Sequence, residues 1–305
     1  MTTPLSATEQ PAWVATSFEI AAGRMVGADH RRIDRACQDA YAWLATSDYL
    51  VAAVCDGCSA GRFSEVGATL GARLFTRALA ARLGRAGDPY LLPATSSCWY
   101  RIWCDVRSDV CTTIARLVSA MGIPVREAVT DYFLFTVVGA AITPASTAVF
   151  AMGDGVFVIN GKVTQVGPFP GNQPPYLAYR MLWDSAPAAS DPADDPMSIA
   201  PVDACQIVDT ADIESIILAS DGACSLAGTS RTSECDDELR AEHEFSQFLA
   251  DRYFRNRDAI RRRLSVINRE TCEIDWQRSQ IRRHRGSLPD DTAIIAIRRR
   301  PAGES

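Results

Sequence analysis

Apolar residues gather near the start of the chain in two stretches that predict β-strands. Residues 17–27 and 39–57 are rich in aromatic and aliphatic side chains. Within the second stretch, Ser47 and Asp48 form a turn signal. We therefore expect that stretch to hold two strands joined by a tight turn.

Two segments with a helical period follow these strands. Val66, Leu70 and Leu74 recur at every fourth residue, and small residues near the same stripe would let a helix over 64–83 approach a sheet closely. A second helix is predicted by an apolar face with spacings of three and four, and it ends at Gly122 and Pro124. The small residues near the stripe of the first helix are Gly67, Gly71 and Ala78. The second helix face consists of Trp103, Val106, Val110, Ile114, Leu117 and Met121.

Strand patterns return in the middle of the chain, where Asn160-Gly161 is a strong hairpin signal. The strands expected there are residues 132–142, 147–152, 155–159 and 162–167. Residues 168–201 are rich in Pro, Ala and Asp without a period, and they predict a surface flap. The last elements expected are a short buried strand that starts at 214 and ends in Asp221-Gly222, helices around 236–283, and a closing strand in 290–300 preceded by two carboxylates.

The order of these elements predicts the fold class. Strands and helices are segregated into blocks, which favours α+β layers with mainly antiparallel sheets over a doubly wound parallel sheet. We expect a single domain over residues 18–300, with short tails at 1–17 and 301–305.

Composition and charge exclude some classes of function. The chain has 305 residues, a formal net charge of −6 and an ordinary share of hydrophobic residues, so we expect no nucleic-acid or membrane-surface partner. Basic residues are nevertheless concentrated between Arg252 and Arg285, which indicates either a solvated helix face, the simpler interpretation, or a surface for a phosphorylated partner. The first residues lack the pattern of a signal peptide, and the longest apolar stretch is interrupted by a turn. A cytoplasmic, monomeric protein is the expectation.

Ten cysteines are many for such a chain. Cys55 and Cys58 form the only C-x-x-C pair, and the three histidines are distant from it in sequence. A zinc ribbon needs a second pair of ligands, which the sequence lacks. A redox-active C-x-x-C pair would lie at the start of a helix, and Cys55 and Cys58 do not fit that pattern. We therefore expect reduced thiols that act as small hydrophobic residues.

Carboxylates recur at the ends of predicted core strands. They are Asp39, Asp56-Gly57, Asp221-Gly222 and Asp290-Asp291. Any one Asp-Gly is typical of a plain turn. Several at the ends of sheet strands can meet, and oxygen-rich clusters suit hard ions such as Mg²⁺ and Mn²⁺.

Five segments carry a resemblance to a known family. In chain order they read "RACQDAYAW", "AVCDGCSAGRFSEVGA", "FAMGDGVFVINGK", "ILASDGACSL" and "PDDTAIIAI". They resemble the metal-dependent protein phosphatases of the 2C type, and most of all a bacterial branch. The match runs from about residue 18 to 298. It implies a four-layer sandwich, with two central antiparallel sheets between helices, and a site for two Mn²⁺ or Mg²⁺ ions in a cleft at one end.

The resemblance also implies roles for particular residues. Asp56 would bridge the two ions, the Gly57 carbonyl would complete one of them, and Asp221 and Asp290 would hold the other. Asp39 would act directly or through water.

Two further carboxylates are candidate ligands by the same resemblance. Asp154 would help to hold a third ion. Asp291 occupies the family's usual Asn position, and it becomes the ligand if the motif is shifted by one residue, because Thr292 comes one place early.

The sequence departs from the family pattern at several positions. Where many members carry a phosphate-clamping Arg, this chain has Asp34, which leaves Arg35 and His30 as candidates beside a surface role for each. Cys58 stands where some relatives have a His, and Ser59-Ala60-Gly61 replaces part of a Gly-Gly loop.

The resemblance implies a phosphoserine or phosphothreonine protein phosphatase. A metal-activated hydroxide would attack phosphorus in line, and the substrate would be a phosphorylated protein such as a Ser/Thr kinase target. The alternatives are a catalytically weak or inactive regulatory binding module with the same fold, or a small-molecule phosphatase.

Overall fold

Two five-stranded sheets form the centre of the molecule in a computed structural model that describes residues 17–84, 95–183, 202–226 and 244–300. The first sheet has the order β1-β12-β9-β6-β7 and the second has the order β2-β3-β4-β5-β8. All neighbouring strands within them are antiparallel. The first sheet consists of β1 (Phe18–Met25), β6 (Gly155–Ile159), β7 (Lys162–Val166), β9 (Ser215–Ala219) and β12 (Thr292–Arg299). The second consists of β2 (Asp39–Ala45), β3 (Leu50–Asp56), β4 (Val137–Ile142), β5 (Ser146–Met152) and β8 (Ala204–Asp209).

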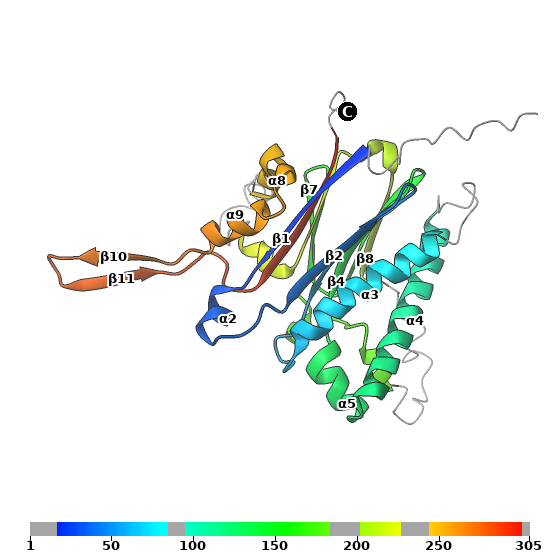
Figure 1. Ribbon diagram of the computed structural model, residues 1–305, viewed down its shortest axis with the longest axis horizontal. Helices are drawn as coiled ribbons and strands as arrows, with labels where there is room; N and C mark the ends of the chain where they lie inside the picture. The colour runs from blue at the N-terminus through cyan, green and yellow to red at the C-terminus, as the bar shows by residue number, and fades with distance from the viewer. Residues whose placement is uncertain (1–16, 85–94, 184–201, 227–243, 301–305) are drawn as a thin grey trace, which may run out of the picture.

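Helices cover the outer face of each sheet (Figure 1). The long helices α3 (Ser64–Gly84) and α4 (Ser96–Met121) pack on the second sheet, followed by α5 (Val125–Ala128) and a turn of π-helix. The short helices α8 (Asp251–Arg255) and α9 (Ala259–Ile267) pack on the first sheet. Two more short helices, α2 (Ala28–Arg32) and α6 (Tyr179–Trp183), lie in connections.

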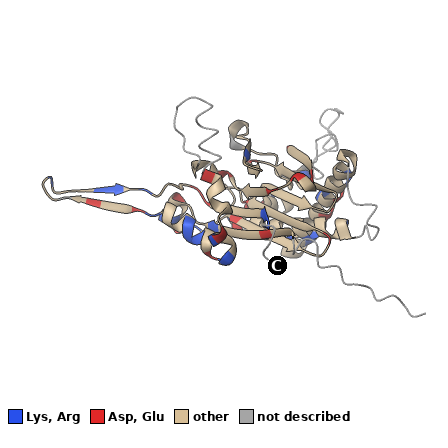
Figure 2. Ribbon diagram, turned by 90° about the horizontal axis from the view of Figure 1, so that it is seen from above, with Lys and Arg blue, Asp and Glu red and all other residues tan. Residues whose placement is uncertain are grey.

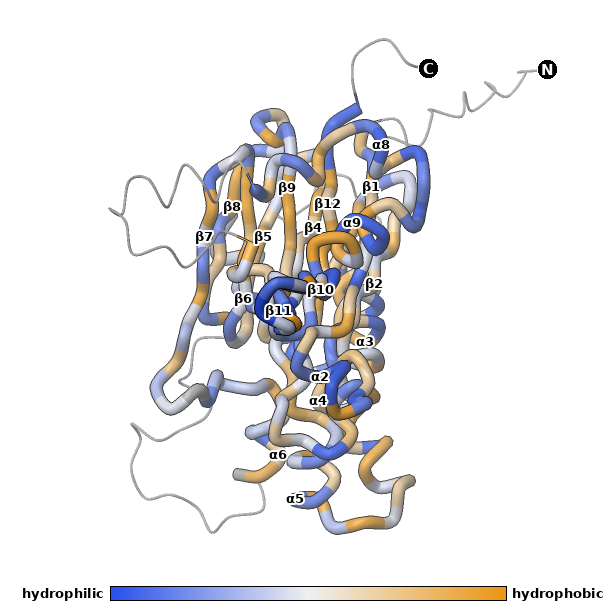
Figure 3. The backbone as a smooth tube through the Cα atoms, turned by 90° about the vertical axis from the view of Figure 1, so that its left-hand side faces the viewer, coloured by the Kyte–Doolittle hydropathy of each residue, from blue (hydrophilic) through white to orange (hydrophobic). Residues whose placement is uncertain are grey.

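The alternation of side chains along each strand produces three separate core layers. On β3, Leu50, Ala52 and Val54 face the other sheet, whereas the residues between them face α3 and α4. On β12, Ile295 and Ile297 face the second sheet and Ile294 faces α8 and α9. Strand β12 is hydrophobic along most of its length (Figure 3), and β3 is buried at every position but its last, because each strand is covered on two faces. The expected four-layer α+β sandwich is confirmed.

The buried faces of the long helices differ in part from the expectation. In α3 the close approach is made by Gly67 and Gly71, where added Cβ atoms would lie 1.6 Å from the Tyr132 carbonyl oxygen and 2.4 Å from the Phe135 ring. Val66 is 41% exposed, and Leu70 and Leu74 are only partly buried, so the predicted stripe was wrong as the packing face. Ala68, Ala72, Phe75 and Leu79 form the buried face instead.

Helix α4 follows its prediction except at the last turn. It begins after the N-cap Thr95 and ends at Gly122, which has the left-handed conformation with φ of 68°. Trp103, Val106, Val110 and Ile114 are buried, whereas Leu117 is partly buried and Met121 is exposed. Val118 continues the buried face, because the stripe drifts around the helix.

Two other expectations need correction. The strand expected from residue 132 begins only at Val137, because Val129–Phe133 is π-helical. The helical region expected around 236–283 includes α8 and α9 but ends in a hairpin of β10 (Thr271–Asp275) and β11 (Gln280–His284). Of the expected flap, residues 184–201 lie outside the described residues, and Tyr176 and Leu177 pack into the core.

Within the described residues, no helix is both long and apolar enough to cross a membrane.

Candidate metal centre

The carboxylates that end core strands meet at one end of the sandwich. Asp39, the first residue of β2, is the register partner of Asp56, the last residue of β3. In the other sheet, Asp221 follows β9 after one residue and Asp290 lies two residues before β12. The two sheets therefore deliver these side chains to the same end from both layers. A cleft there is lined by Gln38, Asp56, Gly57, Cys58, Ser59, Thr136, Asp154, Pro174, Tyr176, Asp221 and Asp290.

Asp39 lies behind this cleft and is almost fully buried. Its Oδ2 atom accepts a hydrogen bond of 2.5 Å from the Ser220 hydroxyl, and its Oδ1 atom has no hydrogen-bond partner. Asp221 Oδ1 is also buried without a partner. Burial is the main cause that raises the pKa of Asp39 and Asp56, and neighbouring carboxylates, Asp221 among them, raise both further.

This arrangement fits a divalent cation. Buried anionic oxygens without partners cost free energy, and a hard cation both satisfies them and neutralises their mutual repulsion. Four aspartates are among the residues that line the cleft, and carboxylate oxygens suit Mg²⁺ and Mn²⁺.

Asp154 reaches the same cleft from the turn between β5 and β6. The flanking Gly153 and Gly155 have positive φ angles of 81° and 149°, which only glycine adopts easily. The Gly153 amide donates a 2.6 Å hydrogen bond to Asp203, which fixes the turn. Burial, followed by the nearby Asp221, raises the pKa of Asp154 to about 6.

Gly57 begins the loop that leads from β3 into α3. An added Cβ at Gly57 would lie 2.7 Å from the Ser64 carbonyl oxygen, so only glycine fits there. The Cys58 amide donates to the Leu134 carbonyl at 2.9 Å, which holds the loop against the neighbouring segment. Cys58 lines the cleft and is hydrogen-bonded to Tyr176, whose pKa is raised mainly by burial and then by this bond.

Arg35 supports this loop from outside the set of cleft-lining residues. Its Nη2 atom donates a 2.7 Å hydrogen bond to the Gly61 carbonyl. Its place as a phosphate clamp stays a prediction.

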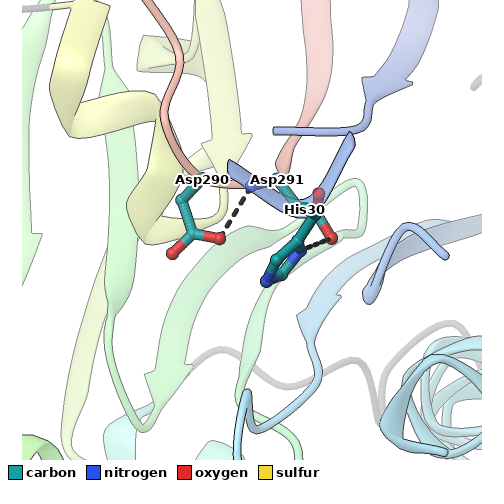
Figure 4. A group of neighbouring side chains, drawn as sticks. All are labelled: His30, Asp290 and Asp291. Atoms are coloured by element: carbon teal, nitrogen blue, oxygen red, sulfur yellow. Dashed lines mark hydrogen bonds and ion pairs between the residues drawn. The ribbon is translucent and has the colours of Figure 1, made fainter. Parts of the chain in front are cut away.

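Asp290 and Asp291 have different surroundings, as Figure 4 shows. Asp290 lines the cleft, whereas Asp291 points toward His30, with 2.9 Å between Asp291 Oδ2 and His30 Nδ1. Both Asp291 oxygens also accept 2.6 Å hydrogen bonds from backbone amides, those of Gly27 and Gln38. Asp291 thus holds the segment between β1 and β2 against β12.

His30, Asp290 and Asp291 nevertheless form a compact group. One ligand atom from each lies within 4.8 Å of the others. The two backbone hydrogen bonds leave Asp291 less available to an ion than Asp290. The choice between Asp290 and Asp291 as ligand, and the role of His30, stay predictions.

Sequence reasoning did not identify several neighbours of the carboxylates. Ser220 bonds Asp39, Gln38 donates through Nε2 to the Ser64 hydroxyl, and Thr136 and Tyr176 line the cleft. A signal existed for two of them, since Gln38 and Ser220 directly precede Asp39 and Asp221 in the motifs. Nothing marked Thr136 or Tyr176, which come from segments distant in sequence.

Comparison with known proteins places the chain in a family. The protein phosphatase 2C model matches residues 26–264, and the chain belongs to this family. Its members are metal-dependent phosphatases acting on phosphoserine and phosphothreonine. No curated protein matches the sequence.

Solved structures match the chain at low identity, and the one with a TM-score above 0.5 shows the same fold. The serine-threonine phosphatase 2C of Toxoplasma gondii is 13% identical with a TM-score of 0.54, and the match covers 98% of each chain. PppA, a regulatory component of T6SS in Pseudomonas aeruginosa, is 16% identical with a TM-score of 0.46 over 93% of this chain and 98% of its own. Stp1 of Staphylococcus aureus is 13% identical with a TM-score of 0.46 over 93% and 96%.

Proposed function

We propose that the protein is a metal-dependent phosphatase that removes phosphate from serine or threonine of a phosphorylated protein. The observation that carries the proposal is the meeting of Asp56, Asp221 and Asp290 at one cleft with Asp39 behind it, where carboxylate oxygens of Asp39 and Asp221 are buried without partners. Membership of the protein phosphatase 2C family supports it.

In this proposal each carboxylate has a distinct place. Asp56 and the Gly57 carbonyl, together with Asp221 and Asp290, hold two Mn²⁺ or Mg²⁺ ions, and Asp154 adds a ligand for a third. Asp39 completes the cluster from behind, oriented by the hydroxyl of Ser220. When bound, the ions activate water near neutral pH and neutralise the phosphate oxygens.

The protein's own groups would bind and orient the substrate. The loop from Gly57 to Gly61, fixed by Arg35 and the Leu134 carbonyl, forms one wall of the cleft, and Tyr176 forms another. These walls would keep the phosphate in line with the attacking water, because small errors in position cost much of the rate.

A direct test is hydrolysis of p-nitrophenyl phosphate and of a phosphothreonine peptide with Mn²⁺, before and after EDTA. We expect Asp56→Asn to lose at least about a hundredfold in kcat while its far-UV spectrum stays the same. Asp109→Asn is the matched control, because Asp109 pairs with Arg82 between α3 and α4 and does not line the cleft. An inert wild-type protein that binds no Mn²⁺ in calorimetry would contradict the proposal.

A regulatory binding module is the second candidate. One observation favours it: no Arg or Lys is among the described residues that line the cleft. Arg35, the candidate phosphate clamp, donates to a backbone carbonyl instead. Such a module would bind Mn²⁺ and a phosphopeptide with slow or absent turnover. A small-molecule phosphatase would hydrolyse p-nitrophenyl phosphate but not the phosphothreonine peptide.

A further inference from the structure

The β10–β11 hairpin stands away from the body of the molecule (Figures 1 and 2). Its two strands pair only with each other and form a separate two-stranded sheet. The side chains described on β11 are all exposed. A hairpin without core packing is marginally stable and does little for the stability of the fold. We call residues 271–284 the arm. Because the arm does little to stabilise the fold, its presence points to a different role.

One face of the arm is apolar. The register places Ile274 opposite Ile281 and Cys272 opposite Arg283, so these four side chains share a face. We call them the isoleucine face. Ile274 is 51% exposed, Ile281 is 65% exposed, and Trp276 at the turn is 82% exposed. Large apolar side chains gathered on a projecting element are typical of an interaction surface.

The charges on the two faces differ. On the opposite face Glu273 is the register partner of Arg282, and Glu273 Oε2 lies 3.3 Å from His284 Nε2. The charges of that face are therefore largely balanced. On the isoleucine face Arg283 lies opposite a thiol. Over residues 271–284 three arginines stand against Glu273 and Asp275, a formal charge of +1 in a chain with a net charge of −6. The isoleucine face itself carries Arg283 and no acidic residue, so it complements an anionic partner.

The base of the arm adjoins the candidate metal centre. Strand β11 ends at His284, and the chain reaches Asp290 six residues later. Arg285 at the base lies 3.9 Å from Asp29 of α2, the helix that also carries His30. A polypeptide held along the arm would therefore continue toward the cleft. Five paired residues span about 17 Å, enough for a short extended segment.

We propose that the arm is a docking element for the phosphoprotein substrate, and that its isoleucine face takes an extended acidic and apolar segment outside the phosphorylated residue. The inference rests on the proposed function. Isoleucine and tryptophan side chains cover the apolar residues of that segment, Arg283 pairs with its carboxylates, and the open strand edges offer backbone hydrogen bonds. A second copy of the chain is the weaker occupant, because two-fold pairing of β11 with itself would set arginines against arginines.

The test compares two twenty-residue phosphothreonine peptides with the same residues around the phosphate. One carries Asp, Glu and Leu in its distal half, and the other carries Gly, Ser and Gln. The full chain is assayed as wild type, Ile281→Ser and Arg283→Gln. Arg282→Gln and Gln280→Ser are matched controls, since they alter neighbouring positions on the opposite face. Turnover of p-nitrophenyl phosphate reports the cleft alone.

We expect wild type and both controls to prefer the acidic peptide by about fivefold in kcat/KM, mainly through KM. Ile281→Ser and Arg283→Gln should lose that preference, with p-nitrophenyl phosphate turnover unchanged in all five proteins. An equal preference in all five proteins would overturn the docking role while leaving the phosphatase intact.

If no phosphate ester is hydrolysed, the proposed function fails and binding decides the role of the arm. Fluorescence anisotropy with the labelled acidic peptide should then show weaker binding to Ile281→Ser and Arg283→Gln only. Equal dissociation constants overturn the proposal. It is also overturned by a wild-type dimer that Ile281→Ser dissociates, or by a single-stranded RNA oligonucleotide binding through Arg283 in place of the peptide.

Discussion

Ser220 links the two sheets at the carboxylate cluster. Its hydroxyl donates to Asp39 at 2.5 Å and accepts from the Ala293 amide at 3.0 Å. The bond to Asp39 lowers the pKa of that carboxyl, opposing the effect of burial. We therefore propose that Ser220 is a positioning residue, whose hydrogen bond favours the ionised form of Asp39 and fixes the orientation of its carboxylate.

Replacing Ser220 tests this role. Ser220→Ala should raise the Mn²⁺ concentration for half-maximal activity about tenfold, because outer partners orient metal ligands. This loss of Mn²⁺ affinity should be larger at pH 6 than at pH 8, because Asp39 without the Ser220 hydrogen bond is harder to ionise at the lower pH. Ser220→Thr should restore most of the affinity, and an Ala variant with wild-type Mn²⁺ dependence at both pH values would argue against the role.

Asp154 gives the metal-free protein a pH-dependent stability. Its pKa of about 6 in the folded protein lies above the ordinary aspartate value of 3.8, so folding favours its protonated form. This contribution is fully present below pH 3.8 and is lost as the pH rises through about 6. The free energy of unfolding of wild type, measured in urea with EDTA, should therefore fall relative to that of Asp154→Asn over this range. A constant difference between the two proteins would contradict the assignment.

At this scale, the sequence could predict the carboxylates but not their partners. Asp39, Asp56, Asp221 and Asp290 stand in short motifs beside core strands, and motif and pattern together placed them at one end of the sheets. The bond from Ser220 to Asp39 spans 181 residues, and local sequence gives no measure of such a distance.

At the scale of elements, α3 depends on a glycine for its fit to the segment before β4. An added Cβ at Gly67 would lie 1.6 Å from the Tyr132 carbonyl oxygen, which is backbone and cannot move aside easily. Because α3 leads directly from the Gly57 loop, its position also fixes one wall of the cleft.

Gly67→Ala should destabilise the protein by about 2 kcal/mol in spite of the better helix propensity of alanine. Gly84→Ala is the control within the same helix, since the nearest atom, the Tyr49 hydroxyl oxygen, would be 3.4 Å away. The free energy of unfolding of Gly84→Ala, measured in urea, should stay within about 0.5 kcal/mol of that of wild type. Equal stability of the two variants would show that α3 tolerates the displacement.

The elements also show the limits of periodicity. The core strands were predictable as apolar runs between turn signals, and the stripe of α4 was predictable because that helix has one buried and one exposed side. Helix α3 is contacted by the sheet, by α4 and by the π-helical turn, so the stripe of Val66, Leu70 and Leu74 did not mark its most buried face. The hairpin at 271–284 was mistaken for helix because its strands are only five residues long, so their alternation is brief, and they follow the helical segment α9 directly.

At the scale of the whole molecule, the three core layers and the arm are separate contributions. The layers bury nearly all the large apolar side chains of the sheets, whereas the arm buries none of its isoleucines. The fold and the arm should therefore be separable.

Replacing residues 271–284 with a short Gly-Ser linker should leave the unfolding free energy within about 1 kcal/mol of wild type. Phe248→Ala, in the layer between α9 and the first sheet, should cost about 3 to 5 kcal/mol. A linker variant as unstable as Phe248→Ala would mean that the arm supports the fold.

The central claim is that the carboxylates at the end of the sandwich form a divalent-metal centre. The most direct measurement is the anomalous difference density of crystals grown with Mn²⁺, for wild type and Asp56→Asn. We predict two peaks in the wild-type cleft among Asp56, Asp221 and Asp290, and the loss of at least one peak in Asp56→Asn. A cleft without any peak, or a single ion held only between His30 and Asp291, would contradict the claim.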